Sequence, residues 1–309
     1  MKCKGGGRTM ETLTQDNNAV VRKNPKKEKK SFPIDKVIIW TLFTFFMIYA
    51  LSLIYPLIWG LISSFKDRLE YRRDPFGIPK EWLFSNYSEA VERISDGGFT
   101  YLEMFWNSIW FTVGSCAISV FFTTAYAYVL NKYQFRGRNF LYNLCLFMIA
   151  VPISASFVST YRLYYNLGMA NSYAILFSAT GVYGMGLIIQ YSFWNNVSWS
   201  YAEAAQIDGA NFYQIFFHAM MPQAMPIMLT QFLMSFISKW NDYMSPLLYL
   251  PEMPTIMVGL FRYRTIVERS GNYPVLFAGL IMCMIPILII FAFFQDKMMQ
   301  NMTLGGLKG

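Results

Sequence analysis

The sequence predicts an all-α integral membrane protein with six transmembrane helices. Of its 309 residues, 55% are hydrophobic and 14% are charged, whereas about a quarter are charged in soluble domains. Apolar windows of about 20 residues, long enough to cross a bilayer, occur six times. None shows the alternation of barrel strands, so each is expected to be helical. The windows are Val37–Phe65, Phe105–Leu130, Asn139–Tyr161, Ser172–Trp194, Ala224–Ser238 continuing to Leu250, and Pro274–Phe294.

Lysine and arginine residues give the predicted orientation of these spans, because cytoplasmic loops carry an excess of positive charge. With six crossings, both termini and the loops after the second and fourth spans share one side. That side holds 15 of the Lys and Arg residues, against 10 on the other. Both termini are therefore expected in the cytoplasm. The formal charge of +8 follows from this topology and gives no reason to expect nucleic acid as a partner.

The predicted organisation follows from the spans and their orientation. A basic tail precedes the first span, and a long extracytoplasmic loop follows it. The remaining spans form a core with one polar cytoplasmic loop. The expected boundaries are 1–36 for the tail, 37–65 for the first transmembrane helix, 66–104 for the extracytoplasmic loop, 105–295 for the transmembrane core, 199–222 for the polar loop, and 296–309 for a cytoplasmic C-terminal tail.

The polar loop begins with the pattern of a short helix. Ser200, followed three residues later by Glu203, is a capping-box pattern, in which hydroxyl and carboxylate each accept a backbone N–H bond. Gly209 enters the left-handed conformation of a helix C-cap at the least cost. We therefore expect a helix that starts near Tyr201 and ends at Asp208.

A second short helix is expected directly after this turn. Asn211 with Gln214 three residues later repeats the start signal, and Pro222 is expected to end the helix. A polar helix–turn–helix between two apolar windows cannot lie in hydrocarbon. It is predicted to protrude as a surface that another protein binds.

The loop contains Glu203-Ala204-Ala205, followed after three residues by Gly209 and after twelve more by Pro222. This spacing resembles the EAA loop of binding-protein-dependent ABC importer permeases. Ala219 and Met221 depart from that pattern, which usually has Ile and Leu at these positions, although both remain apolar. Without its context, the spacing could also be a chance match in a surface helix. The residues that the resemblance implies in coupling to an ATPase are Glu203, Ala204, Ala205, Asp208, Gly209 and Pro222.

Other segments resemble the carbohydrate, maltose-type group of these permeases. They are the Pro-rich stretch with a Trp and an Asn-Tyr pair at 75–87, the segment 107–139 with its basic FRGR turn, WNDY at 240–243, and the C-terminal TLGGLKG at 303–309. The resemblance implies a type I ABC importer permease fold with both termini cytoplasmic. It also implies a multi-pass protein of a bacterial-type inner membrane.

The same resemblance implies a transport function with separate subunits. A second permease subunit, an ABC ATPase dimer and an extracytoplasmic binding protein would be partners, and a sugar or oligosaccharide would be the substrate. The chain has no GxxxxGK[ST] sequence, so ATP hydrolysis is expected in a partner chain and this subunit is expected to be non-catalytic. With one histidine and four scattered cysteines, neither a metal site nor a cofactor is expected.

Polar residues within the fourth and fifth spans are candidates for a translocation path. Charged groups at membrane depth usually face protein or water. Lys239 and Asp242, three residues apart, can neutralise each other, so a simple intrahelical pair is an equal alternative to a path. The candidates are Gln190, Tyr191, Gln231, Ser235, Lys239, Asn241 and Asp242.

Two other functions remain open from the residues alone. An ABC permease could carry another polar solute, such as a glycerophosphoester. A stand-alone channel or scaffold is an alternative of a different class, and the absence of a co-purifying ATPase would favour it.

Overall fold

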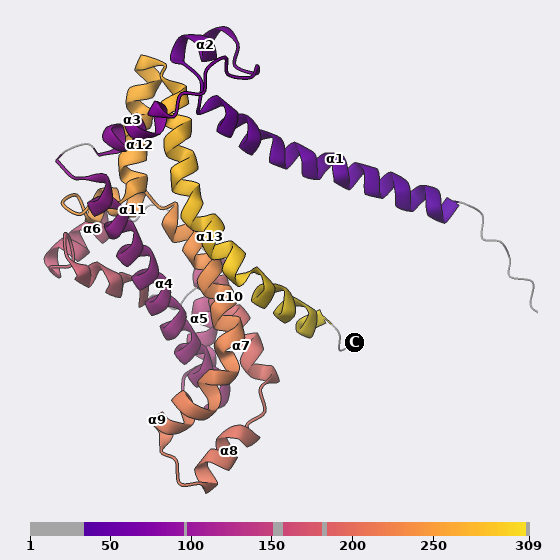
Figure 1. Cartoon of the computed structure of the whole chain (residues 1–309). Helices are drawn as coiled ribbons and strands as arrows, with labels where there is room; N and C mark the ends of the chain where they lie inside the picture. Colours follow the sequence, from indigo (N-terminus) through magenta and orange to yellow (C-terminus); the bar gives the residue numbers. More distant parts are fainter. Residues whose placement is uncertain (1–33, 96–97, 151–156, 181–183, 307–309) are drawn as a thin grey trace, which may run out of the picture. The chain divides into compact units, whose positions relative to one another are not determined.

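The computed structural model describes residues 34–95, 98–150, 157–180 and 184–306 (Figure 1). All the regular structure in these ranges is helical. The elements are α1 Ile34–Ser63, α2 Arg68–Arg73, α3 Ser85–Ile94, α4 Tyr101–Lys132, α5 Arg138–Ala150, α6 Phe157–Asn166, a 3-10 helix Tyr173–Thr180, α7 Met185–Asn196, α8 Ser200–Ile207, α9 Phe212–Gln214, a π-helix Ile215–Met220, α10 Met221–Trp240, α11 Met244–Tyr249, α12 Ile256–Ser270 and α13 Tyr273–Gly306.

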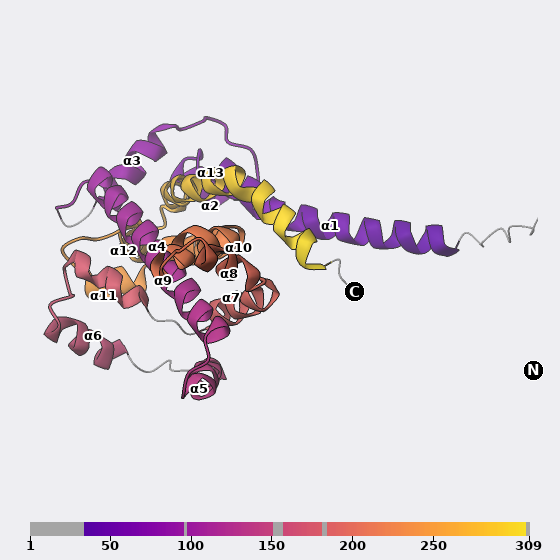
Figure 2. The same ribbon diagram turned by 90° about the horizontal axis from the view of Figure 1, so that it is seen from below.

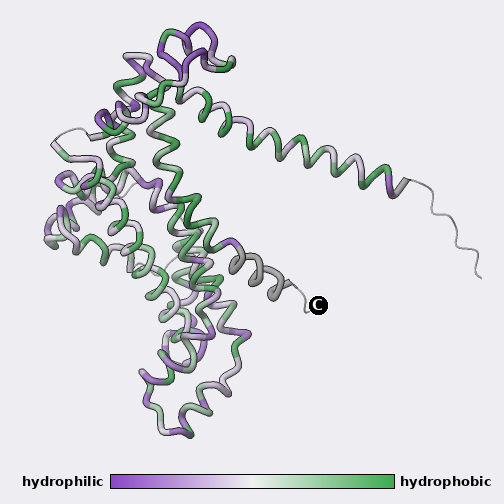
Figure 3. Tube along the Cα trace, in the orientation of Figure 1, coloured by the Kyte–Doolittle hydropathy of each residue, from purple (hydrophilic) through white to green (hydrophobic). Residues whose placement is uncertain are grey.

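Four helices of the described part are long and apolar enough to cross a membrane. They are Lys36–Ser63, Tyr101–Lys132, Phe212–Trp240 and Tyr273–Gln295. These correspond to the first, second, fifth and sixth predicted windows, and Figure 3 shows the hydrophobic colour running along most of α13. The described residues thus contain four such helices, so the predicted set of six is confirmed only in part.

The third and fourth windows each contain two helical segments in the described residues. The third consists of α5 and α6, and residues 151–156 between them lie outside the described ranges. In the fourth, the 3-10 helix and α7 meet at 58° and could together form a fifth, broken span. Gly184 at the start of α7 has a φ of +106°, which a continuous α-helix cannot contain.

The fifth window also ends earlier than predicted. A continuation to Leu250 is wrong, because α10 stops at Trp240 and a separate helix, α11, follows. The Asn241 side chain donates to the Ile237 carbonyl at 2.8 Å, and an Asp242 carboxylate oxygen accepts from the Ser245 backbone N–H at 3.0 Å. The Asn241 backbone N–H donates to the same Ile237 carbonyl at 3.4 Å, and the Asp242 carboxylate takes the Ser245 N–H away from helical bonding. Such local side-chain bonds favour a turn.

The chain divides into two compact units, Met1–Ile54 and Tyr55–Gly309. In the first unit the described residues belong to α1, and the side chains of 36–54 are exposed and almost all apolar, a surface suited to lipid. The predicted basic tail lies outside the described residues as far as residue 33. The predicted C-terminal tail is helical as far as Gly306, as the last part of α13.

The second unit is built around α4. This helix packs against α7, α10 and the 3-10 helix, while α13 packs against α3, α10 and α12. Figure 2 shows α4 and α10 crossing with α7 beside them. Within this unit α3 and α12 lie at one end and α8 and α9 at the other (Figure 1). The loops predicted on opposite sides of the membrane are thus separated in space.

A closely packed cap forms the end of the unit that contains α3. Asn86 is buried and its side-chain amide donates to the carbonyls of Ser64 and Lys66 at 2.8 and 2.9 Å. At the other end of α3, a Cβ added at Gly259 of α12 would lie 2.5 Å from the Ile94 carbonyl oxygen. Only glycine therefore lets these two helices approach so closely.

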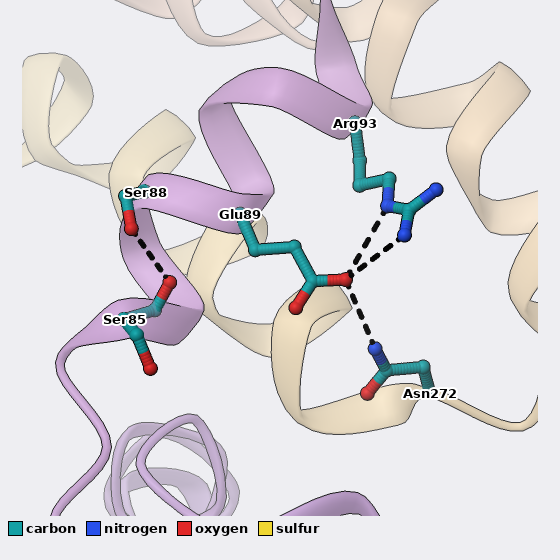
Figure 4. Close-up of polar contacts among 5 residues, drawn as sticks. All are labelled: Ser85, Ser88, Glu89, Arg93 and Asn272. Atoms are coloured by element: carbon teal, nitrogen blue, oxygen red, sulfur yellow. Dashed lines mark hydrogen bonds and ion pairs between the residues drawn. The ribbon is translucent and has the colours of Figure 1, made fainter.

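Polar contacts on the surface of this cap join α3 to the loop between α12 and α13. One carboxylate oxygen of Glu89 accepts from the Arg93 guanidinium at 3.3 Å and from the Asn272 amide at 3.5 Å (Figure 4). Burial raises the pKa of Tyr263 on α12 to about 12, the negative charge of Glu89 adds to this rise, and the positive charge of Arg93 opposes it. The phenol is therefore neutral at pH 7.

Candidate functional site

The helix predicted in the polar loop is α8, but its start differs from the prediction. The N-cap residue is Trp199, without a side-chain cap bond, and its carbonyl accepts from the N–H groups of Ala202 and Glu203. Trp199 already has helical dihedral angles, so Ser200 lies inside the helix and lacks the extended backbone that an N-cap needs. The predicted Ser200–Glu203 capping box is therefore wrong. The Ser200 hydroxyl lies 2.8 Å from that of Ser198.

The end of α8 is as predicted. Gly209 has a φ of +82°, in the left-handed region. Its N–H donates to the Gln206 carbonyl and the N–H of Ala210 donates to that of Ala205, both at 3.0 Å. This pair of bonds is a Schellman motif. The glycine is needed here because an L side chain is strained at this φ.

The second start signal is also confirmed. Asn211 and Gln214 form a reciprocal capping box, with side-chain to backbone bonds of 2.8 and 3.0 Å. Pro222, however, does not end this helix. The π-helix carries the chain directly into α10, with Pro222 in the first turn of that helix. A proline lacks the N–H of a helical bond, and the wider π turn accommodates the missing bond.

Most of the α8 surface is exposed. Ala202 is its one buried residue and packs into a core with Trp194 and Met220. The loop before α8 is held to the end of α4 by a bond of 2.6 Å from the Lys132 ammonium to the Val197 carbonyl. Of the residues predicted for coupling, Glu203, Ala204, Asp208 and Gly209 are exposed, Ala205 is half-buried and Pro222 is exposed.

A cavity of about 690 Å³, lined by both apolar and polar side chains, lies between α4, α7, α10 and the 3-10 helix. Among the predicted path residues Gln231, Ser235 and Lys239 line it. The other polar side chains of its lining are hydroxyls, contributed by Ser115, Ser119, Thr123, Ser178, Thr230 and Ser238. Its wall can therefore exchange hydrogen bonds with a hydroxyl-rich solute.

Gln190 lies behind this wall and is fully buried. Its amide nitrogen donates to the side-chain oxygen of Gln231 at 2.8 Å. Its own side-chain oxygen has no protein hydrogen-bond partner among the described residues. A Cβ added at Gly186 would lie 2.1 Å from the Gln231 amide nitrogen, so this glycine makes room for the Gln231 side chain.

The remaining predicted path residues lie elsewhere. The Tyr191 hydroxyl accepts from Arg138 of α5 at 3.1 Å, and the residue does not line the cavity. Asn241 and Asp242 lie in the turn after α10. The Lys239 ammonium is 3.4 Å from an Asp242 carboxylate oxygen, as expected for a neutralising pair, but Asp242 lies beyond the end of the helix.

The hydroxyls that α4 contributes were not among the predicted path residues. As small residues, Ser115 and Ser119 would also suit close packing between membrane helices. Ser115, Ser119 and Thr123 repeat every four residues, so they share one face of α4. That spacing is the signal by which they could have been found.

Residues 119–303 match the family described as "Binding-protein-dependent transport system inner membrane component". The chain belongs to this family. Its relatives include the probable ABC transporter permease protein YurM of Bacillus subtilis, which is 28% identical over 92% of each chain. The arabinooligosaccharides transport system permease protein AraQ of Halalkalibacterium halodurans is also 28% identical, over 91% of this chain and all of that protein.

The fold agrees with a solved structure of a transporter of this type. A chain in the crystal structure of a bacterial ABC transporter involved in import of the acidic polysaccharide alginate aligns with a TM-score of 0.72 and 24% identity, over 86% of this chain and 98% of that one. As an inner membrane component of a binding-protein-dependent transport system, the chain is a multi-pass membrane protein and a non-catalytic permease subunit. The matched region contains α8, its left-handed turn and most of the cavity lining.

Proposed function

We propose that this chain forms half of the translocation pathway of an ABC importer for a sugar or oligosaccharide. The main support for a sugar as substrate is the cavity between α4, α7 and α10. The polar part of its lining consists of hydroxyls, the Gln231 amide and the Lys239 ammonium. Relatives named for oligosaccharide transport support the same class.

The proposed partners are a second permease subunit, a pair of ABC ATPases and an extracytoplasmic binding protein. The proposed location is a bacterial-type inner membrane, with both termini and the 199–222 loop in the cytoplasm. In this arrangement the exposed face of α8 enters a groove of the ATPase. Ala204 and Ala205 allow close approach and the Glu203 carboxylate can pair with a basic residue there.

The helix that follows the Gly209 turn also lines the cavity, and this connection provides a mechanism for coupling the ATPase to the cavity. Residues Phe212–Trp240 form one continuous helix. At about 1.5 Å of rise per residue, Gln231 lies about 28 Å along it from Phe212. Movement of α8 and α9 with a closing ATPase pair would therefore move Gln231, Ser235 and Lys239 relative to α4. Such movement couples ATP binding to alternating access only if ATP favours one state of the bundle.

A glycerophosphoester is a weaker fit to the cavity. Its phosphate would need a cation, and the Lys239 ammonium already has the Asp242 carboxylate at 3.4 Å. A stand-alone channel or scaffold would not need the exposed face of α8 and its Schellman turn.

The test is to purify tagged chain from its native membrane in mild detergent, identify the co-purifying proteins, and measure uptake of labelled oligosaccharides. Gly209→Val is compared with Gly271→Val. Both glycines cap a helix in the left-handed region, with φ of +82° and +76°, but Gly271 ends α12 at the opposite end of the unit. We expect an ATPase and a second permease with wild type and with Gly271→Val, and loss of the ATPase with Gly209→Val. Recovery of a monodisperse chain alone would favour the channel or scaffold.

A further inference from the structure

Three residues from α7 and α10 form a small polar assembly at the cavity wall. Gln190 and Gly186 lie one turn apart on α7, and Gln231 faces them from α10. Gln190 is fully buried, whereas Gln231 and Gly186 line the cavity. The two glutamines are joined by the bond of 2.8 Å between amide nitrogen and oxygen.

The bond leaves the Gln231 amide with one defined orientation. Its oxygen is engaged by Gln190, so its nitrogen is the atom that lies over Gly186. Within the described residues no protein acceptor is bonded to that nitrogen. Its N–H groups therefore remain available to an acceptor oxygen of a solute in the cavity.

A purely structural role explains this assembly less well. Interhelical hydrogen bonds between polar side chains do hold membrane helices together. However, a bond made only to hold the two helices together would not need Gln231 at the cavity wall, nor a glycine directly beneath its amide nitrogen.

We propose that Gln190 is a positioning residue that holds the Gln231 amide over Gly186, with its N–H groups directed to a hydroxyl-rich solute in the cavity. Gln190 does not contact the solute and acts through Gln231. The inference rests on the proposed function for the nature of the solute, but the position of Gln231 can be measured without any solute.

The test uses the complex reconstituted in nanodiscs and proteoliposomes. Gln190→Met keeps the side-chain length and removes the amide. Gly186→Ala leaves Gln190 intact and places a Cβ where the Gln231 amide nitrogen lies. The control is Leu187→Met on the same helix, a volume-conserving change of a buried apolar residue. The readouts are the position of Gln231 by electron cryomicroscopy and the KM and maximal rate of oligosaccharide uptake.

Both test variants should displace Gln231 from Gly186 and raise KM about five-fold, the effect of one lost hydrogen bond. The maximal rate and the membrane abundance should stay within about two-fold of wild type, as should all values for Leu187→Met. Gln231→Met should raise KM by a similar factor, and Gln190→Met should add no further increase to it, because residues that act through one another are not additive.

An unmoved Gln231 in Gln190→Met would overturn the inference, as would independent, multiplying effects of the two glutamine substitutions on KM. If the wild-type complex transports no saccharide, the proposed function fails instead. The displacement of Gln231 then still decides whether Gln190 positions it.

Discussion

Two short helices at opposite ends of the second unit, α3 and α8, differ in how far their side chains are buried in, or hydrogen-bonded to, the rest of the chain. In α3, Asn86, Ala90 and Ile94 are buried, and its polar groups bond to neighbouring segments of the same chain. In α8 only Ala202 is buried. The first helix is thus part of the framework, whereas the second has an exposed surface, which we propose meets the ATPase. Substitutions in α3 should change stability, and substitutions in α8 should change transport.

The largest effect is expected at the close contact that fixes α3. Gly259→Leu would place side-chain atoms against the Ile94 carbonyl oxygen and the end of Met104, since even a Cβ would lie 2.5 and 2.6 Å from them. We expect a loss of about 3 kcal/mol or more, as for severe overpacking, and little folded protein. Membrane abundance and size-exclusion profile measure this. Gly60→Leu is the control, because a Cβ at Gly60 meets nothing within 4 Å. Normal abundance of Gly259→Leu would mean that α3 is free to move away.

The second-largest effect is expected on transport alone, from a substitution in the turn that ends α8. Gly209→Val puts a β-branched residue at a φ of +82°, at a cost of about 1–2 kcal/mol confined to the turn. We expect uptake to fall more than ten-fold with abundance close to wild type. Normal uptake at normal abundance would show that the α8 turn has no role in coupling.

These two glycines also show what the sequence could and could not predict. The turn at Gly209 and the cap at Asn211 are local, because each depends on residues within three or four positions, and both were predicted correctly. The role of Gly259 was not predicted, since it depends on Ile94, which is distant in the chain. Pro222 misled the prediction because a π turn lets the helix continue through it.

The candidate cavity was predicted only in part for the same reason. Lys239 and Gln231 were found because polar residues in an apolar window are conspicuous. Ser119 and Thr123 were not found, because a small hydroxyl residue in a membrane helix serves equally for packing, and only the arrangement of α4 against α10 assigns it to a cavity. Tyr191 was assigned to a path although its hydroxyl bonds to Arg138.

A smaller loss of stability is expected from Asn86→Ala. The substitution removes two hydrogen bonds and leaves the carbonyls of Ser64 and Lys66 without this donor. The cost should be about 1–3 kcal/mol, seen as a lower Tm in detergent, while the uptake rate per folded molecule stays unchanged. Ser88→Ala on the same helix is the control, because its exposed hydroxyl bonds only to the Ser85 carbonyl (Figure 4). A Tm equal to that of Ser88→Ala would contradict the view that Asn86 anchors α3.

The capping box of α9 should have an effect of about 1 kcal/mol. Asn211→Ala removes the acceptor of the Gln214 N–H at 3.0 Å and should leave the start of α9 frayed. Faster hydrogen exchange at residues 212–214 and a partial loss of uptake are expected, with little change in Tm. Asn196→Ala, which also loses one exposed side-chain bond, serves as the control. Equal exchange rates in the two variants would show that the cap does not order this turn.

The smallest effect is expected from Glu89→Gln. The Glu89–Arg93 pair is an i,i+4 contact of 3.3 Å with side-chain exposures of 36% and 58%, and exposed pairs of this kind contribute about 0.5 kcal/mol or less. The Tm should therefore change little, as for Glu268→Gln in the more exposed pair with Arg264.

Removing the negative charge should also lower the pKa of Tyr263, which should stay above 10 because burial is the main cause of its rise. Because the native state holds its Tyr263 proton more tightly than the unfolded state, stability falls as pH rises from 10 toward 12, and a smaller rise in pKa means a smaller loss. Alkaline unfolding of Glu89→Gln should therefore begin at a slightly higher pH. A Tm loss near pH 7 as large as that of Asn86→Ala would mean that the surface bonds of Glu89, and not the buried bonds of Asn86, fix α3 in place.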